Sequence, residues 1–377
     1  MKILYLTNSI PKPSNVMKGI FNFRRIKELK NLNMDVKVVS INNILRRNLS
    51  IQVGKNYNFK DLNYDFNIEI NVFNNLKLPG IESLTNIYKR LAKYIKTNRI
   101  DIVHAHFVGM GYIAYKLKKY YGIPYVVTAH GSDIHTNPFK SKKNRKKALL
   151  ALNNANEVIF VSEFLKRKAM DFGYNNNNFN IIPNGIEKSF LDVESKPKHK
   201  RRLIGFVGNL KRIKRADVLP DIFYEVLKKI NNVEFVIVGE GPLKSNINNK
   251  LEDLNIKNKV MLTGKIHPNE VKKYMKEMDI MILPSKKEGW GCVVLEAHAT
   301  GTLVLGSNNG GIPEAVGNME WIIEDDKDLI NKFSSKIIYY LEKGYNSKEL
   351  KQRARNYTWD KIIQKEIKVY KNILEQI

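Results

Sequence analysis

The sequence of 377 residues contains one cysteine, Cys292, so no disulfide can form within the chain. A chain with this cysteine content is typical of a reducing compartment. The sequence also lacks any apolar run of the roughly 18 residues that a membrane-spanning helix requires. The opening segment MKILYLT is too short for a signal peptide and fits a first strand better. We therefore expect a cytoplasmic protein.

Two common nucleotide-binding signatures are missing as well. The first predicted strand is followed by NSIPKPSNVMKGIFNF, a long loop with two prolines and one glycine. A dinucleotide-binding enzyme would have G-x-G-x-x-G in a tight turn at this place. No G-x-x-x-x-G-K-[ST] segment occurs either. The sequence therefore gives little support to hydride transfer or to nucleoside triphosphate hydrolysis.

Acidic residues are scarce relative to basic ones, because 37 Asp and Glu stand against 64 Lys and Arg and leave a net charge of +27. Such an excess favours anionic partners, namely phosphate-bearing ligands, nucleic acid or an anionic membrane surface. The densest basic runs are residues 140–147 and 196–202. Neither run has interleaved aromatic residues, which weakens the interpretation as a nucleic-acid-binding protein.

Short β-type runs alternate with amphipathic stretches of helical period, which is the pattern of parallel α/β sheets. A charged, apolar-poor stretch at roughly 187–200 separates two halves and is expected to be a linker. We therefore expect two doubly wound sheets whose carboxyl edges face a central cleft. The predicted strands are 2–7, 36–41, 102–106, 125–128 and 157–162 in the first half, and 203–208, 233–239, 259–264, 279–285 and 302–307 in the second.

The most informative segment is KEGWGCVVLEAH, residues 287–298. Its two acids, Glu288 and Glu296, would lie about 12 Å apart if the segment is helical from Cys292 onward. That separation is too long for a glycosidase acid/base pair, which needs about 5 to 10 Å, and it suits the two ends of one ligand. The glycines between the acids let the backbone approach a ligand, and free amide groups at the helix start favour phosphate. We therefore expect a sugar nucleotide, with its diphosphate at the helix start and its hexose toward Glu288.

Motifs over the whole length of the chain resemble those of the retaining glycosyltransferases of family 4. The resemblance implies an α/β GT-B fold with two Rossmann-like domains facing a central cleft. It implies an acceptor-binding domain at 1–187, a nucleotide-sugar-binding domain at 188–357, and a C-terminal helix at 358–377 that crosses back to the first domain. The segments that carry the resemblance are HAHF (104–107), PYVVTAHGSDI (124–134), VSEFL (161–165), IIPNGIE (181–187), GFVGNLKRIK (205–214), IVGEGPL (237–243), LTGKI (262–266) and the stretch 284–316.

The resemblance also implies three catalytic residues, His130, Lys214 and Glu288. Lys214 resembles the family's phosphate-binding lysine, which would neutralise charge on the departing diphosphate. His130 ends a predicted strand, and the resemblance places it beside the donor sugar. The implied donor-binding residues are Gly19, Asn209, Arg212, Gly289, Trp290, Gly291, Cys292 and Glu296.

The chain departs from the family pattern at three positions. The family usually has arginine where this chain has Asn209, and glycine where it has Arg215 and Lys18. Arg212 or Arg215 is available to supply the missing charge. A further tight turn is expected at 310–311. Glu314 follows it and either contributes to the site or is an ordinary acidic residue in the first turn of a helix.

A metal site is not expected. His104 and His106 alternate on a predicted strand and share one face, with Asp133 and His135 in the same half. No cysteine, helical H-E-x-x-H segment or acidic partner completes a ligand set around them. The acidic run at 324–328 is expected to be a solvated loop. We therefore predict a reaction without metal or other cofactor.

The predicted function is a retaining, metal-independent hexosyltransferase that moves a sugar from a nucleoside-diphosphate sugar to a hydroxyl acceptor. The inferred acceptor is a lipid-linked or polysaccharide glycan intermediate. Its use at the inner face of the membrane would explain the positive charge, which suits peripheral docking on anionic lipid. A sugar-nucleotide epimerase or another GT-B enzyme is the alternative, and a basic nucleic-acid-binding protein is the weaker one.

Overall fold

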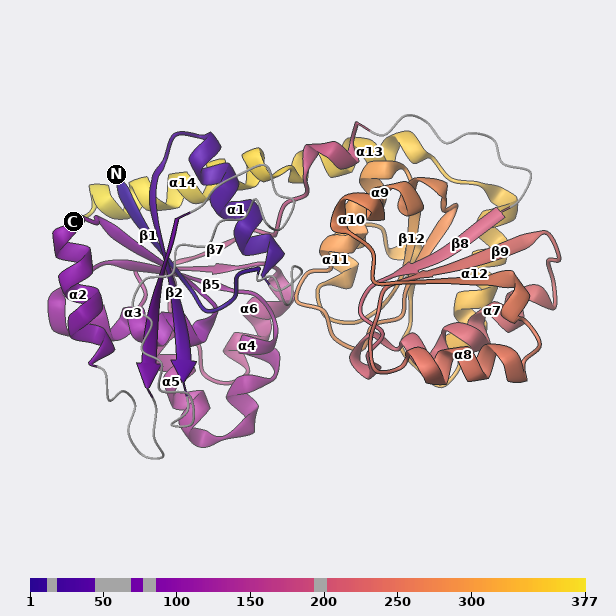
Figure 1. Cartoon of the computed structure of the whole chain (residues 1–377), viewed down its shortest axis with the longest axis horizontal. Coiled ribbons are helices and arrows are strands. Elements are labelled where there is room, and N and C mark those ends of the chain that lie inside the picture. The colour runs from indigo at the N-terminus through magenta and orange to yellow at the C-terminus, as the bar shows by residue number, and fades with distance from the viewer. Residues whose placement is uncertain (12–18, 45–68, 77–85, 193–201) are drawn as a thin grey trace. The chain divides into compact units, whose positions relative to one another are not determined.

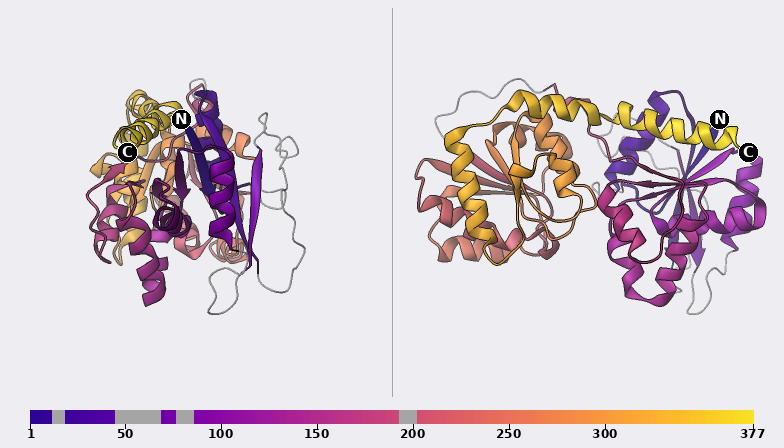
Figure 2. Two further views of the ribbon diagram at one scale, coloured as in Figure 1. Left: turned by 90° about the vertical axis from the view of Figure 1, so that its left-hand side faces the viewer. Right: turned by 180° about the vertical axis from the view of Figure 1, so that it is seen from behind.

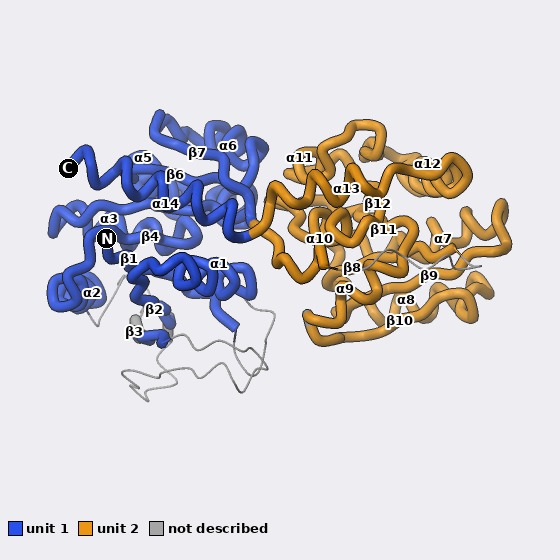
Figure 3. The backbone as a smooth tube through the Cα atoms, turned by 90° about the horizontal axis from the view of Figure 1, so that it is seen from above, with its two compact units in different colours: residues 1–184, 359–377 blue, residues 185–358 orange. Residues whose placement is uncertain are grey.

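The computed structural model describes residues 1–11, 19–44, 69–76, 86–192 and 202–377. These residues form two compact units (Figure 3). Unit 1 comprises Met1–Asn184 and Trp359–Ile377, and unit 2 comprises Gly185–Thr358. No helix within the described part of the chain is both long and apolar enough to cross a membrane.

Unit 1 is built on a seven-stranded parallel sheet with the order β3-β2-β1-β4-β5-β6-β7 (Figure 1). The chain moves from β1 outward to β3 and then returns to start β4 beside β1, so the sheet has a switch point between β1 and β4. Ligands of open α/β sheets bind at the carboxyl ends of the strands at such a point. The strands are β1 (Lys2–Thr7), β2 (Asp35–Ile44), β3 (Ile70–Leu76), β4 (Ile102–His106), β5 (Tyr125–Ala129), β6 (Glu157–Phe160) and β7 (Phe179–Ile181).

Helices cover both faces of this sheet, with α1 and α14 on one face and α3 and α5 on the other (Figure 1). All residues of β4 and β5 are buried, as expected for central strands covered on both sides. Two helices have a serine N-cap. The Ser141 hydroxyl accepts a hydrogen bond from the Asn144 amide at the start of α5, and the Ser162 hydroxyl accepts one from the Leu165 amide at the start of α6. The helices are α1 (Ile20–Asn31), α2 (Ile87–Thr97), α3 (Val108–Tyr121), α4 (Ser132–His135), α5 (Lys142–Asn153), α6 (Glu163–Met170) and α14 (Trp359–Glu375), with a 3-10 turn η2 (Asn137–Lys140).

The C-terminal helix α14, the yellow end of the chain in Figure 2, packs against α1. It also carries one member of a buried ion pair. Arg25 of α1 and Glu366 of α14 are both fully buried, and their Nη1 and Oε1 atoms lie 2.7 Å apart. Arg25 also donates through Nη2 to Asn184 Oδ1 at 2.9 Å, and its guanidinium lies 5.4 Å from the ring centre of Trp359. Helices α1 and α14, which lie far apart in the sequence, are therefore held together by an ion pair as well as by apolar packing.

Unit 2 repeats the architecture with a six-stranded parallel sheet of order β10-β9-β8-β11-β12-β13. Its switch point lies between β8 and β11. Phe223 and Phe235 stack at 4.2 Å within its apolar core. The strands are β8 (Arg202–Val207), β9 (Val233–Val238), β10 (Val260–Gly264), β11 (Ile280–Leu283), β12 (Leu303–Ser307) and β13 (Ile322–Ile323).

Helices α7, α8 and α12 pack on one side of this sheet, and α9, α10 and α13 on the other. The bounds are α7 (Leu219–Leu227), α8 (Lys244–Asp253), α9 (Pro268–Glu277), α10 (Cys292–Thr300), α11 (Ile312–Val316), α12 (Leu329–Lys343) and α13 (Ser347–Ala354). Short 3-10 turns are η3 (Lys188–Phe190), η4 (Arg212–Lys214), η5 (Ala216–Val218), η6 (Lys257–Lys259), η7 (Met319–Trp321) and η8 (Arg355–Tyr357).

All ten predicted strands are present, and the α/β class with two doubly wound sheets is confirmed. Three further strands, β3, β7 and β13, were not predicted. Of the expected linker at 187–200, residues 188–190 form the turn η3, while 193–200 lie outside the described residues. Lys18 and most of the basic run at 196–202 lie outside them too. The expected cleft between the domains stays a prediction.

Candidate active site

Two loops of unit 2 leave the neighbouring strands β8 and β11 at the carboxyl edge of the sheet. Lys214 ends the turn η4 in the first loop, and Glu288 lies in the second loop before α10. The backbone N–H of Lys286 donates to the Ile213 carbonyl at 2.9 Å and joins the two loops. The structure therefore brings two of the predicted catalytic residues to the switch point of unit 2, where ligands of this sheet type bind.

Lys214 and Glu288 form an ion pair between Nζ and Oε1. The Ser285 hydroxyl donates to the same carboxylate oxygen at 3.0 Å. The side chains keep only 26% and 11% of their surface exposed, so solvent screens their attraction less than that of a surface pair. A phosphate that binds Lys214 would have to compete with the Glu288 carboxylate.

Helix α10 begins at Cys292, as predicted, and its N-cap residue is Gly291 with φ 89°. A glycine has no side chain that could accept a hydrogen bond from the first-turn amides. The positive end of the helix dipole therefore points into the same loop that carries Glu288. Glu296 lies one turn further along the helix and is half-buried.

The turn at 310–311 supports the backbone of the Glu288 loop. Gly311 donates its N–H to the Glu288 carbonyl at 3.0 Å. A Cβ atom on Gly310, whose φ is 64°, would lie 2.2 Å from that same carbonyl oxygen, and one on Gly311 would lie 2.4 Å from the Gly289 oxygen. Only glycine allows this close approach, so the predicted tight turn holds the Glu288 loop in place.

Trp290 is 5% exposed, and its ring lies 5.8 Å from that of Tyr357. The side chain thus belongs to the packing of unit 2. The predicted contact of Trp290 with the donor would have to come from its backbone.

Arg215 follows η4 in the left-handed conformation, with φ 49°. Its Nη1 atom lies 2.6 Å from Asp325 Oδ1, and Asn309 donates to the other oxygen of Asp325 at 2.6 Å. The Arg215 guanidinium holds the pKa of the Asp325 carboxyl below its usual value. Residues 324–328 are exposed, as expected for a solvated acidic loop, and within it Asp325 also neutralises Arg215. Arg212 and Asn209 are both exposed, and the role of Arg212 in donor binding stays a prediction.

Gly19 of unit 1 is the N-cap of α1, with φ 68°. A Cβ atom there would lie 2.2 Å from the Ser9 carbonyl oxygen. Asn22 fixes the same loop, because its Nδ2 atom donates to the Ser9 oxygen at 2.7 Å and to Thr7 Oγ1 at 3.1 Å. The chain therefore needs a glycine at position 19 for its own packing, whether or not a ligand binds there.

His130 follows β5 at the carboxyl edge of unit 1, and its loop is held by Asp133. The buried carboxylate of Asp133 accepts from the amides of His130 at 3.1 Å, Gly131 at 2.7 Å and Val108 at 3.1 Å. Burial raises the pKa of Asp133 although these amides oppose the shift. The sequence had suggested Asp133 only as a metal ligand to be discounted, and this role as an anchor of two loops was missed.

Three histidines lie together beside these loops. His106 Nδ1 is 3.2 Å from His130 Nε2, while both nitrogens of His104 are bonded to hydroxyl groups. Burial lowers the pKa of all three imidazoles well below the usual value, with the Arg25 charge as a further cause. Among the described residues, no group of three or more His, Cys, Asp or Glu side chains is arranged to hold a metal ion.

Comparisons with known proteins agree with this architecture. Residues 26–190 match the model described as Glycosyltransferase Family 4, and residues 187–357 match that described as Glycosyl transferases group 1. TuaC of Bacillus subtilis (strain 168), a glycosyltransferase with a proposed role in teichuronic acid biosynthesis, is 28% identical over 345 residues, which are 86% of this chain and 85% of that protein.

The UDP-Gal:alpha-D-GlcNAc-diphosphoundecaprenol alpha-1,3-galactosyltransferase of Escherichia coli is 29% identical over 259 residues, 62% of this chain and 63% of its own. The crystal structure of Anabaena HepE in complex with UDP has a TM-score of 0.79 at 18% identity, over 99% of this chain and 100% of that one. The two family models together span residues 26 to 357, and the chain belongs to glycosyltransferase family 4 and has the GT-B fold.

Proposed function

We propose that the protein transfers a sugar from a nucleoside diphosphate sugar to a hydroxyl acceptor, with retention at the anomeric carbon and without a metal ion. The observation that carries this proposal is the Lys214–Glu288 pair beside the glycine-capped start of α10. It is supported by the Escherichia coli relative, whose name gives UDP-Gal as its donor, and by the UDP bound to HepE.

In the proposed reaction the donor diphosphate lies at the start of α10. It forms an ion pair with Lys214, which replaces the ion pair between Lys214 and Glu288. The Glu288 carboxylate then accepts hydrogen bonds from hydroxyls of the sugar. Glu296 accepts hydrogen bonds from hydroxyls of the ribose. The bond between the anomeric carbon and the diphosphate oxygen breaks, and Lys214 stabilises the charge left on that oxygen. The acceptor oxygen bonds to the same face of the anomeric carbon, and its proton passes to the departing diphosphate.

A donor panel tests the proposal. We expect one class among the uridine, guanosine and adenosine diphosphate sugars to raise the melting temperature by about 5 to 10 °C at a hundredfold excess over its Kd, because binding then adds about 2.7 kcal/mol. The matching donor should also be hydrolysed slowly, with EDTA present. Release of an altered sugar nucleotide without any acceptor would establish the epimerase alternative instead, and no binding by any of the three classes would contradict the proposal.

We further propose that the acceptor is lipid-linked and that the enzyme docks on the anionic inner face of a membrane. Support comes from the first turns of α5, where Lys142, Lys143 and Lys146 are exposed. Phe139, just before this helix, is 58% exposed. Basic residues beside an exposed aromatic ring suit the interface of an anionic bilayer. The Escherichia coli relative is named for a diphosphoundecaprenol acceptor.

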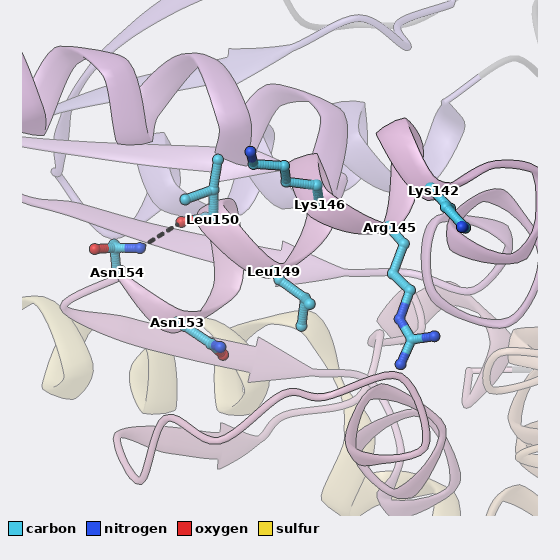
Figure 4. Close-up of a pocket in the computed structure, with 7 residues that line it drawn as sticks. All are labelled: Lys142, Arg145, Lys146, Leu149, Leu150, Asn153 and Asn154. Carbon is cyan, nitrogen blue, oxygen red and sulfur yellow. Dashed lines mark hydrogen bonds between the residues drawn. The ribbon is translucent and has the colours of Figure 1, made fainter.

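Figure 4 shows the same helix from the side of a shallow pocket of about 340 Å³. It is lined by Leu149 and Leu150, the amides Asn153 and Asn154, and the basic residues Lys142, Arg145 and Lys146. Aliphatic side chains next to basic ones suit an acyl chain and its phosphate headgroup.

Reversing three of these charges, in Lys142→Glu/Lys143→Glu/Lys146→Glu, should weaken binding to vesicles that contain anionic lipid at least about 100-fold, since each basic residue near such a surface contributes about 1 kcal/mol. Co-sedimentation with vesicles with and without phosphatidylglycerol measures the effect. The matched control is Lys361→Glu/Lys365→Glu/Lys368→Glu, an equal charge change on exposed lysines of α14. Equal losses in both variants would mean that net charge, and not this surface, directs binding.

A further inference from the structure

Four neighbouring strands of unit 2, β8, β11, β12 and β13, end at the same carboxyl edge of the sheet. The loop after β8 carries Lys214, and the loop after β11 carries Glu288. The loop after β12 contains the turn at 310–311, and the loop after β13 begins with the acidic run 324–328. Because neighbouring strands are about 4.8 Å apart, the first and the last of these strands are separated by about 14 Å.

The first three of these loops are bonded to one another in the order of their strands. The Lys286 N–H donates to the Ile213 carbonyl at 2.9 Å and joins the loops after β8 and β11. The ion pair between Lys214 and Glu288 joins the same two loops. The Gly311 N–H donates to the Glu288 carbonyl at 3.0 Å and joins the loops after β11 and β12. Each of these bonds links a loop only to its neighbour.

Asp325, in the loop after β13, is bonded to two of the other loops. Asn309, in the loop after β12, donates through Nδ2 to Asp325 Oδ2 at 2.6 Å. Arg215, in the loop after β8, has its Nη1 atom 2.6 Å from Asp325 Oδ1. The contact between Arg215 and Asp325 therefore joins the first loop to the last, and the four loops form a closed ring.

The contact between Arg215 and Asp325 holds a backbone conformation that favours glycine. Arg215 has φ 49°, in the left-handed region that arginine seldom adopts. It follows Lys214 directly, so its conformation determines how the chain leaves the turn η4. Although the acidic loop as a whole is exposed, the side chains of Arg215 and Asp325 keep only 16% and 24% of their surface exposed. Solvent therefore screens this pair less than a pair on the open surface.

The proposed reaction breaks one link of the ring. When the donor diphosphate replaces Glu288 as the partner of Lys214, the loops after β8 and β11 lose their ion pair. The backbone bond between Lys286 and Ile213 remains, together with the connection through Asp325. Because a displacement of about 1 Å can lower a rate by about 100-fold, a connection that survives donor binding protects the position of Lys214 in the transition state.

We infer that Asp325 is a positioning residue of the donor site, which keeps the Lys214 loop and the Glu288 loop at a fixed distance after the donor has separated Lys214 from Glu288. The inference rests on the proposed function for its ligand. It also assigns Arg215 to Asp325, so that Lys214 meets the leaving diphosphate and Arg215 does not. The competing interpretation is that Arg215 leaves Asp325 and binds the diphosphate itself.

Removing either partner of the contact between Arg215 and Asp325 tests its role in transfer. We expect Asp325→Asn and Arg215→Gln each to lower kcat about 10- to 100-fold with KM for the donor within about threefold, because placement in the transition state is lost while donor binding is kept. The double variant should be no slower than the slower single variant, since both changes open the same ring. Asp326→Asn is the matched control and should keep the rate, because this exposed acid of the same loop pairs with Lys332 instead.

Three kinetic results would overturn the inference. If Arg215→Gln lost the rate while Asp325→Asn kept or raised it, Arg215 would bind the diphosphate. If both variants kept kcat within about twofold, the ring would not position the site. If the two losses multiplied in the double variant, the two residues would act separately.

Hydrogen–deuterium exchange without any substrate tests the ring itself. The amides of Lys286 and Gly311 form its backbone links. We expect the segments that contain them to exchange at least about threefold faster in Asp325→Asn than in Asp326→Asn, because an open ring lets these loops open locally more often. Equal exchange in the two variants would refute the inference even if the donor panel identifies a donor. Faster exchange in Asp325→Asn would support the ring even if the panel contradicts the proposed function.

Discussion

Replacing Lys214 by alanine should lower kcat/KM for sugar transfer by about 10²- to 10³-fold, the usual effect of removing one group that stabilises charge in a transition state. Lys214 lies at the carboxyl edge of unit 2, in contact with Glu288. Its charge should matter most when the diphosphate departs. The measurement is initial rate against the concentration of the donor found in the panel.

Lys229→Ala is the matched control, because this exposed lysine lies beyond the end of α7. It should retain the rate of the unsubstituted enzyme. Glu288→Gln separates binding from transfer: it removes the carboxylate that competes for Lys214, so the free nucleoside diphosphate should bind at least as tightly, while transfer falls. If Lys214→Ala kept the rate within tenfold, the diphosphate would have to be held elsewhere.

Much of the fold could be predicted, because the pattern of apolar and polar residues within a segment indicates which of its residues are buried. The central strands consist mostly of apolar residues, and such runs indicate strands covered on both faces. β7 has three residues, none of which is buried, β13 has only two residues, and β3 contains three asparagines. These strands carry too little apolar signal to be recognised, and they form because a neighbouring strand offers them hydrogen bonds.

The candidate site could be predicted in outline for a related reason. Parallel strands end at one edge, so the residues that follow β5, β8 and β11 were expected at ligand-binding positions. Which polar groups pair across long stretches of chain could not be predicted. Nothing local to Arg215 points to Asp325, and nothing local to Asp133 shows the three amides that it binds. Periodicity describes how each segment is buried and carries no information on its partner.

The buried pair of Arg25 and Glu366 is the clearest case of such a partnership, and we expect Glu366→Ala to destabilise unit 1 by about 3 to 5 kcal/mol. The substitution leaves a fully buried guanidinium with no opposite charge at 2.7 Å. Asn184 still accepts one hydrogen bond, but a neutral amide does not replace a carboxylate. Helix α14 should then separate from α1 more readily than any helix held by apolar contacts alone.

Urea unfolding measures this loss if the signal comes from unit 1. Trp359 lies in unit 1 and the other two tryptophans, Trp290 and Trp321, lie in unit 2, so a background with phenylalanine at those two positions reports unit 1 by fluorescence. Glu375→Ala, at an exposed acid in the same helix, should change stability by less than about 0.5 kcal/mol.

The double variant Arg25→Met/Glu366→Leu separates loss of attraction from burial of a lone charge. Apolar residues of similar volume often replace a buried pair at little cost, so the double variant should be more stable than Glu366→Ala. If both were equally unstable, the stability of α14 on unit 1 would depend on the attraction itself. If Glu366→Ala lowered the free energy of unfolding by less than about 1 kcal/mol, water would have to reach Arg25. Arg25 would then not be fully buried next to α14.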